Sequence, residues 1–287
     1  MTVLLTGAKG MLAADVMRKM PAGLTIIETD IEELDITDVA AVSALCKECE
    51  PNMIFNCAAY TAVDAAETDS AAAYAVNEAG PRVLATVCAQ CDIPLVHVST
   101  DFVFFGDGKQ PMRENDATAP QGIYALSKRA GERAIENSGC AFLTVRTSWL
   151  YGAAGKNFPD TMLNLAAERD RLTVVNDQTG SPTYSPDLAE ALWKLIEAKA
   201  SGYVHFSNSG ACTWFDFAVE TIRLGKEYGI LPTDKTLEIA PVTSEEFVRP
   251  APRPAYSVMD TGKYTQLTGT LPRTWQEGLR EYIAAKG

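Results

Sequence analysis

A glycine-rich turn near the N-terminus constrains the fold of this chain more than any other feature. The apolar run 3–6 leads directly into Gly7, Gly10 and Ala13, and the acidic Asp30 follows 20 residues after Gly10. Between a strand and a helix, this spacing brings backbone N–H groups and a helix N-terminus to the pyrophosphate of a dinucleotide. The segment therefore predicts a nucleotide-binding βαβ unit in which Asp30 accepts hydrogen bonds from the adenosine ribose.

Strands and helices continue to alternate through the first half of the chain. We expect further strands at 24–29, 53–57, 94–99 and 141–146, and helices at 38–50 and 123–137, with an Ala-rich helical region ending near residue 90. This order indicates an α/β fold, a Rossmann-type doubly wound parallel sheet with helices on both faces. Beyond residue 146 Pro and Gly become frequent around helices expected at 158–168, 186–200 and 215–228. We therefore expect a dinucleotide-binding domain over 1–150 and a smaller α/β substrate lobe over 151–287, with some segments returning to the sheet.

Composition narrows the classes of partner. The net charge of −12 argues against nucleic acid or an anionic membrane surface, since both would repel the chain. No apolar run reaches the 18 residues of a membrane span, and the N-terminus lacks the basic and apolar regions of a signal peptide. We therefore expect a cytoplasmic protein that binds a small molecule.

The seven cysteines do not form an obvious framework. Their odd number is untypical of a disulfide-stabilised fold, and we expect them to be reduced and buried. Two Cys-x-x-Cys pairs, Cys46 with Cys49 and Cys88 with Cys91, end neighbouring predicted helices. A four-thiolate zinc site stays open as an alternative if the two helices meet.

Tyr124 and Lys128 are four residues apart on a predicted helix and therefore share one face. A phenol has a pKa of about 10, and a nearby ammonium favours the phenolate, which suits proton transfer. Thr100 ends a predicted strand and offers a hydroxyl to a reacting oxygen. The alternative is a solvated lysine whose stem packs on a half-buried tyrosine. Residues 35–36, 56–61 and 99–101 also follow strands, which places polar groups along one edge of the sheet.

Several runs of sequence together resemble extended short-chain dehydrogenase/reductases, and most closely the dTDP-4-dehydrorhamnose reductase family. The matching runs are 5–12, 56–67, 99–104, 114–120, 124–128, 146–151 and 176–183, with Arg253, Ser257 and Asp260 fitting the C-terminal segment. The resemblance covers nearly the whole chain. Ala13, Cys57 and Phe102 depart from the residues that are usual in the family, and none of these changes removes a reacting group.

The resemblance implies roles for individual residues. Tyr124 would be the proton donor, Lys128 would lower its pKa and hold the nicotinamide ribose, and Thr100 would contact the substrate carbonyl. The expected cofactor-binding residues are Gly7, Gly10, Met11, Leu12, Asp30, Asp35, Ile36, Ala59, Tyr60, Thr61, Tyr124 and Lys128. The expected sugar-nucleotide contacts are Thr100, Asp101, Trp149 and Arg253. Asn77 resembles a residue that kinks a helix near the proton relay.

The implied activity is NADH- or NADPH-dependent reduction of the C4 ketone of dTDP-4-dehydro-L-rhamnose to dTDP-L-rhamnose. Lys9 counters the preference of Asp30 for NADH, so the choice of cofactor stays open. A related 4-reductase or an epimerase is the first alternative, and an NADP-binding regulatory subunit like that of methionine adenosyltransferase is the second. Phe102 argues against a 4,6-dehydratase. We expect a monomer or a homodimer; Asp15 falls near a Mg²⁺ ligand of some dimeric relatives, but one carboxylate does not predict a metal.

Overall fold

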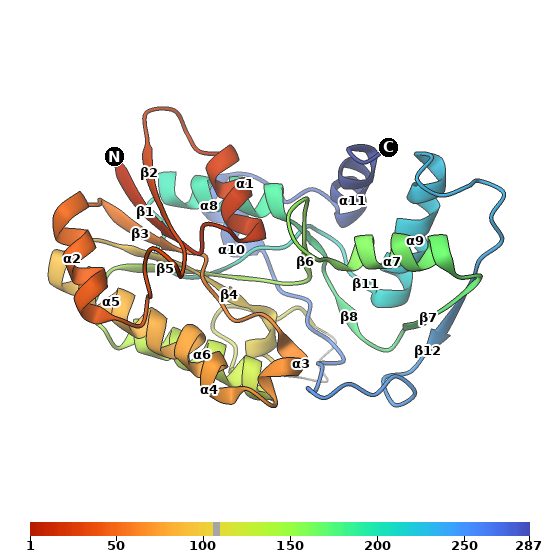
Figure 1. Ribbon diagram of the computed structural model, residues 1–287, viewed down its shortest axis with the longest axis horizontal. Coiled ribbons are helices and arrows are strands. Elements are labelled where there is room, and N and C mark those ends of the chain that lie inside the picture. The colour runs from red at the N-terminus through yellow and green to blue at the C-terminus, as the bar shows by residue number, and fades with distance from the viewer. Residues whose placement is uncertain (106–109) are drawn as a thin grey trace.

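The computed structural model describes residues 1–105 and 110–287 and divides into two lobes (Figure 1). The larger lobe is built on a six-stranded parallel sheet in the order β10-β5-β4-β3-β1-β2. Its strands are β1 (Thr2–Thr6), β2 (Thr25–Thr29), β3 (Met53–Asn56), β4 (Leu95–Thr100), β5 (Phe142–Thr147) and β10 (Gly202–His205). Since β2 and β3 lie on opposite sides of β1, the strand order reverses between β1 and β3, which is where doubly wound sheets bind ligands.

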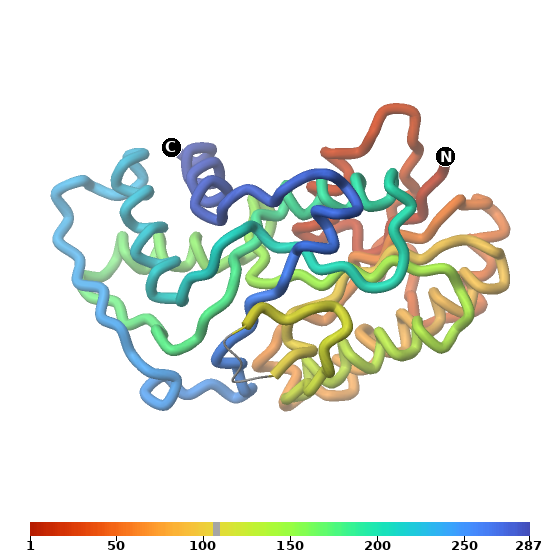
Figure 2. Tube along the Cα trace, turned by 180° about the vertical axis from the view of Figure 1, so that it is seen from behind, coloured from red at the N-terminus to blue at the C-terminus, as the bar shows by residue number. Residues whose placement is uncertain are grey.

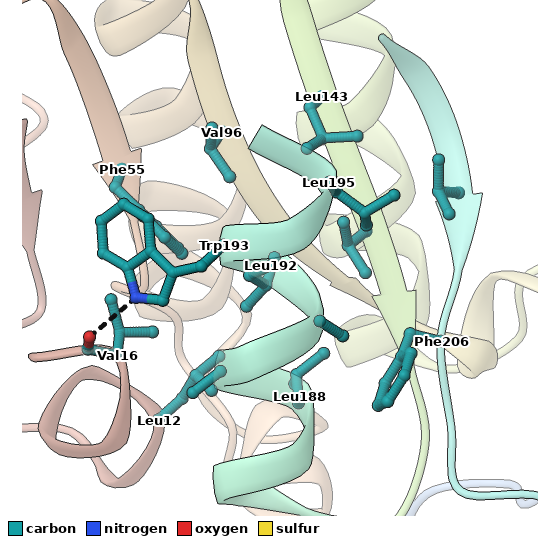
Figure 3. Packing of buried hydrophobic residues seen from close by; sticks show 14 of the residues in the cluster. Leu12, Val16, Phe55, Val96, Leu143, Leu188, Leu192, Trp193, Leu195 and Phe206 are labelled. Carbon is teal, nitrogen blue, oxygen red and sulfur yellow. Dashed lines mark hydrogen bonds between the residues drawn. The ribbon is translucent and has the colours of Figure 1, made fainter. Parts of the chain in front are cut away.

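Helices cover both faces of this sheet. One face packs against α1 (Met11–Arg18) and α8 (Ser185–Glu197), and the other against α2 (Val39–Cys49), α5 (Gly80–Cys91) and α6 (Ile123–Glu136). Figure 3 shows the first core, in which Trp193 of α8 lies against Phe55 and donates a hydrogen bond from Nε1 to the carbonyl of Val16 (2.9 Å). Burying apolar side chains on both faces forces every strand to be apolar nearly throughout, as the sequence is.

The smaller lobe has its own aromatic core. Its helices are α7 (Phe158–Glu168), α9 (Trp214–Glu227) and α11 (Trp275–Ala284). Its strands are short: β6 (Leu150–Tyr151), β7 (Arg171–Val175), β8 (Thr179–Gly180), β9 (Thr183–Tyr184), β11 (Cys212–Thr213) and β12 (Glu238–Val242). Tyr151, Tyr184, Phe217 and Tyr282 stack around one another at centroid distances of 5.4–5.9 Å.

The chain crosses between the lobes more than once. From the second half of the sequence, α8, β10 and α10 (Gly262–Thr268) join the sheet lobe, as expected for returning segments. Figure 2 shows the stretch before α10 running between the lobes, where Met259 pairs with Met112 and Tyr256 with Thr179. These pairings tie the C-terminal segment to the loop that follows β4 and to β8 of the smaller lobe.

The expected strands and helices are confirmed, with one difference. The Ala-rich region is not one helix but α3 (Val63–Ala66), α4 (Ser70–Tyr74), a π-helical turn (Ala75–Ala79) and then α5. No helix within the described ranges is both long and apolar enough to cross a membrane.

Candidate active site

Tyr124 and Lys128 lie in the first two turns of α6. Glu67 fixes the start of this helix, because its Oε1 accepts a hydrogen bond from the Ile123 N–H (2.7 Å). Gly122 has a φ of +79°, and an added Cβ would lie 2.8 Å from the same oxygen, so only glycine fits there. The Lys128 side chain is fully buried, and its Nζ donates a hydrogen bond to the carbonyl of Val98 on β4 (2.8 Å).

Thr100 and Asp101 end β4 beside Tyr124. The Thr100 hydroxyl donates to Asp101 Oδ1 (3.0 Å) and accepts a bond from the Phe102 N–H (3.2 Å). Phe102 in turn packs edge-on against the Tyr124 ring, with centroids 5.6 Å apart. The expected catalytic residues therefore meet at the carboxyl end of the central strand.

Burial dominates the acid–base behaviour of this group. It raises the pKa of Tyr124 to about 12, with a further contribution from the Asp101 charge and an opposing one from the Thr100 hydroxyl. Burial lowers the pKa of Lys128 to about 8, and Glu132 and Cys57 oppose that change. The pKa of the phenol is thus raised here, whereas a role for Lys128 in lowering it was expected. The reason is that the ammonium bonds to the Val98 carbonyl and the ring is desolvated.

Asn77 holds this region to the loop after β3. It lies in the π-helical turn, where its Oδ1 accepts from the Tyr60 N–H (2.9 Å). Its Nδ2 donates to the Tyr60 carbonyl (3.0 Å) and to Ser127 Oγ (3.1 Å). An added Cβ at Gly131 of α6 would collide with the Asn77 carbonyl, so the two helices approach as closely as a glycine allows. The helix is irregular at Asn77, as expected.

A crevice lies at the strand-order reversal. Gly7 has a φ of +71°, and an added Cβ there would be 2.6 Å from the Ala58 nitrogen, so the loops after β1 and β3 approach backbone to backbone. Gly10 is the N-cap of α1, which leaves the N–H groups of the first turn, including those of Met11 and Leu12, free of side-chain caps. A cavity of about 410 Å³ opens here, and its lining includes Gly7, Lys9, Gly10, Asp30, Asp35, Ile36, Ala58 and Ala59.

Acidic groups surround the far end of the crevice. Asp30 accepts hydrogen bonds from the Lys9 and Ile31 N–H groups (both 2.8 Å). Asp35 accepts from Thr37, and that bond lowers its pKa. The Lys9 ammonium bonds to Glu32, which raises the pKa of Lys9. The cation that could favour a 2′-phosphate is therefore already paired with a carboxylate.

Trp149 packs against the aromatic core of the smaller lobe. Its φ is +46°, which is strained for a bulky residue. The indole stacks on Trp214 with centroids 3.5 Å apart and an interplanar angle of 8°, and it leaves no room for a Cβ at Gly180. Trp214 is fixed by a hydrogen bond from its Nε1 to Gln178 Oε1 (3.2 Å). Trp149 is therefore held by Trp214, a contact that the sequence did not suggest.

Arg253 reaches the site from the C-terminal segment. Its Nη2 donates to Asp64 Oδ1 (3.0 Å), and its guanidinium lies over the Phe102 ring, 5.8 Å from the centroid. Phe102 thus connects Arg253 to Tyr124. The Arg253 side chain is one-fifth exposed, so part of it remains accessible to solvent.

Of the seven cysteines, Cys57 lines the crevice after β3. All seven are free thiols; Cys46 and Cys88 are buried as expected, but Cys91 is exposed because it ends α5. Within residues 1–105 and 110–287, no three His, Cys, Asp or Glu side chains are grouped so that they could hold a metal ion.

Comparison with known proteins decides the family. A family model described as "RmlD substrate binding domain" matches residues 1–286. A dTDP-4-dehydrorhamnose reductase from Streptomyces griseus is 42% identical, with 98% of this chain and 93% of that protein covered. The chain belongs to the dTDP-4-dehydrorhamnose reductase family.

Solved structures of family members share the whole architecture. A reductase from Clostridium acetobutylicum superposes with a TM-score of 0.93 at 40% identity, covering 100% of this chain and 99% of that one. One from Bacillus anthracis, solved in complex with NADP, gives a TM-score of 0.92 at 37% identity, with 99% of each chain covered. The Rossmann-type fold and the family resemblance inferred from the sequence are thereby confirmed.

Family motifs did not reveal every residue that shapes this site. Sequence reasoning missed the roles of three residues. Glu67 bonds to the start of α6, Glu132 is bound by Arg146 of β5, and Trp214 stacks on Trp149. Glu132 had a usable signal, because it lies four residues after Lys128 and therefore on the same helical stripe. Glu67 and Trp214 had none, since their contacts join segments far apart in the chain.

Proposed function

We propose that this chain reduces the C4 ketone of dTDP-4-dehydro-L-rhamnose to dTDP-L-rhamnose, with NADH or NADPH as the reductant. The observation that carries the proposal is the convergence of Thr100, Tyr124 and Lys128 at the end of β4. The family of the chain supports the substrate. The crevice suits a dinucleotide because glycines at Gly7 and Gly10 leave its backbone N–H groups accessible at the start of α1.

The proposed reaction follows from which groups of the site carry a proton. The bound reduced nicotinamide supplies the hydride. Tyr124 carries its proton at neutral pH, since its pKa is about 12, and it donates that proton to the oxygen that becomes negative at C4. Thr100 offers a second hydrogen bond to the same oxygen when its hydroxyl proton turns to the substrate from Asp101 Oδ1, which accepts it here (3.0 Å). The Lys128 ammonium, one turn along the same helix, would stabilise the phenolate that remains on Tyr124 once it exchanges its bond to the Val98 carbonyl for one to the phenolate oxygen.

Side chains outside the crevice suit a sugar nucleotide. We propose a division into a cofactor-binding domain over 1–150 and a substrate lobe over 151–287, with Asp101, Trp149 and Arg253 on the sugar-nucleotide side. Arg253 would meet the diphosphate, provided that it exchanges its bond to Asp64 for one to phosphate. Seven free thiols suit the reducing cytoplasm.

The direct test is oxidation of NADH and NADPH by the purified protein with dTDP-4-dehydro-L-rhamnose, compared with the UDP and GDP analogues. We expect turnover with the dTDP sugar and a 6-deoxy sugar product reduced at C4, identified by NMR. An epimerase would instead retain NAD through purification, visible in its absorbance. A regulatory subunit would bind NADPH without oxidising it. Either of these results would refute the reductase assignment.

A further inference from the structure

Two carboxylates beside the cofactor loop have no role in the proposed reaction. The loop after β3 continues past the expected cofactor contacts at 59–61 into α3, where Asp64 and the following Glu67 are the charged side chains. Both carboxylates bond to segments that are far away in the chain. Their partners indicate what this part of the loop does.

Asp64 binds a segment near the C-terminus, residues 249–254, which we call the strap. Its Oδ1 accepts hydrogen bonds from the Ala251 N–H (3.3 Å) and from Nη2 of Arg253 (3.0 Å). Its Oδ2 lies 3.7 Å from Nη1 of Arg249. Nη1 of Arg253 donates to the Ala251 carbonyl (3.0 Å). One carboxylate thus holds both the backbone of the strap and the side chain of Arg253.

The strap also packs against the start of α6. A Cβ added to Gly122 would lie 3.0 Å from Cδ of Pro252 and 2.8 Å from Oε1 of Glu67. The same Glu67 oxygen accepts the hydrogen bond from the Ile123 N–H (2.7 Å). The end of α3, the strap and the first turn of the helix that carries Tyr124 therefore meet at Gly122.

Arg253 extends from the strap to the neighbourhood of the proposed proton donor. Its guanidinium lies 5.8 Å from the centroid of Phe102, and the Phe102 ring packs edge-on against Tyr124 at 5.6 Å. A guanidinium presents its N–H donors in a planar fork that matches the oxygens of a phosphate. The bonds to Asp64 and to the Ala251 carbonyl fix the direction of this fork before a ligand arrives. Less conformational entropy is then lost when a phosphate binds.

Asp64 could act on Arg253 in two opposite ways, as a competitor of the phosphate or as an anchor of the strap. The contacts favour the anchor, because only one of three donors has to leave when Arg253 turns to a phosphate. The carboxylate then keeps the Ala251 N–H and the charge of Arg249. Its own charge stays paired, and the strap stays docked on α3.

We propose that Asp64 is a positioning residue for the sugar nucleotide: it anchors the strap to α3 and thereby places Arg253 to bind the diphosphate. The inference rests on the proposed function, because it needs a ligand that carries a diphosphate. Arg249 is the cation that remains on Asp64 when Arg253 exchanges. Removing the anchor should therefore weaken diphosphate binding, and only while Arg253 is present.

The first measurement is the Kd of dTDP by isothermal titration calorimetry, with the Kd of NADPH measured alongside. Asp64→Ala should weaken dTDP binding by about tenfold and leave NADPH binding unchanged; the pair is partly exposed (31% and 20%), which limits the effect. Asp64→Asn keeps an oxygen that accepts from the Ala251 N–H and should stay within about threefold of wild type. Asp69→Ala is the matched control, since this nearby carboxylate caps α4 through the Ala72 N–H (3.3 Å). It should change neither Kd.

The second measurement is a double-mutant cycle with Arg253. Arg253→Gln should itself weaken dTDP binding by about 10- to 100-fold, the worth of a bond to a charged group. Adding Asp64→Ala in that background should cost less than about twofold more, because the two residues act as one unit. A merely structural Asp64 would cost the same factor in both backgrounds, and that additive result would refute the inference.

The outcomes separate the two proposals. If the cycle is as stated but the chain does not reduce dTDP-4-dehydro-L-rhamnose, the proposed function fails and the role of Asp64 stands. If Asp64→Ala binds dTDP as tightly as wild type or more tightly, the role of Asp64 is overturned, whatever the reductase activity. If Asp64→Ala does not fold, Asp64→Ser takes its place in the same cycle with the same expectation, since its hydroxyl lies one bond closer to the backbone.

Discussion

The proposed cofactor and substrate regions differ in what forms them. In the proposed cofactor region, Gly7 and Gly10 have no side chains, and the loops after β1 and β3 touch backbone to backbone. The proposed substrate residues include a buried carboxylate at Asp101 and a positive-φ indole at Trp149, both of which are costly states. One side should therefore be sensitive to added atoms, and the other to changed chemistry.

The largest expected effect tests the close approach of the loops after β1 and β3. Gly7→Ala should weaken NADH and NADPH binding by about 100-fold, because the new Cβ would lie 2.6 Å from the Ala58 nitrogen and spread the two loops. Gly23→Ala is the control, since Gly23 also has positive φ (+83°) but has nothing within 4 Å of an added Cβ. Titration of cofactor fluorescence measures both. Equal losses of affinity would mean that strain, not the close approach, matters.

Asp101 tests the proposed substrate region. Burial raises its pKa from 3.8 to about 6, and its Oδ2 has no hydrogen-bond partner among the described residues. The folded state therefore binds a proton more readily than the unfolded chain, so stability should fall as pH rises from about 4 to 6. Asp101→Asn should remove this dependence and stabilise the fold at pH 7 by up to about 3 kcal/mol while lowering turnover. Urea unfolding across pH checks it; a variant that unfolds more easily at pH 7 would contradict it.

A smaller effect is expected at Trp214, which stacks on the proposed substrate contact Trp149. Trp214→Leu removes the ring on which Trp149 stacks at 3.5 Å. We expect the KM for the dTDP sugar to rise about tenfold, in line with the worth of an aromatic pair, with cofactor affinity unchanged. Trp214→Phe keeps a stacked ring and should stay within about threefold of wild type. Steady-state kinetics with each substrate varied separates these effects. A loss confined to cofactor binding would contradict the placement of Trp214 near the sugar nucleotide.

The smallest effect concerns the choice of cofactor. Glu32→Gln frees the Lys9 ammonium at the rim of the crevice, which should favour a 2′-phosphate. Because the pair is exposed, the ratio of kcat/KM for NADPH to that for NADH should rise only about two- to fivefold. Adding Lys9→Met should cancel the gain. An unchanged ratio in the single variant would remove Lys9 from cofactor selection.

Sequence reasoning succeeded where local pattern and fold coincide. The apolar strands, the Gly7 turn and the Tyr124–Lys128 stripe are periodic or motif-like signals, and the structure arranges them around one sheet edge. The strands of the smaller lobe could not be predicted individually, because β8, β9 and β11 are only two residues long and show no hydrophobic period. The family resemblance led us to expect an irregular helix at Asn77, but not its π-helical form, since π geometry has no propensity signal of its own.

The pKa shifts and long-range ion pairs of the site were the hardest features to predict from the sequence. The spacing of Tyr124 and Lys128 suggested a lowered phenol pKa, but it could not show that burial would raise it to about 12. Likewise Asp64, which pairs with Arg253 at 3.0 Å, lies 189 residues from its partner. Such terms depend on desolvation and on long-range contacts, which only the folded chain reveals.

The proton-donor role of Tyr124 is the centre of this account, and Tyr124→Phe tests it most directly. The measurement is the single-turnover rate of NADPH oxidation with saturating dTDP-4-dehydro-L-rhamnose, together with the Kd of NADPH. We predict a rate lower by about 10²–10⁴-fold with Kd unchanged, because the ring packed on Phe102 is retained and only the proton is lost. A rate close to wild type would contradict the account.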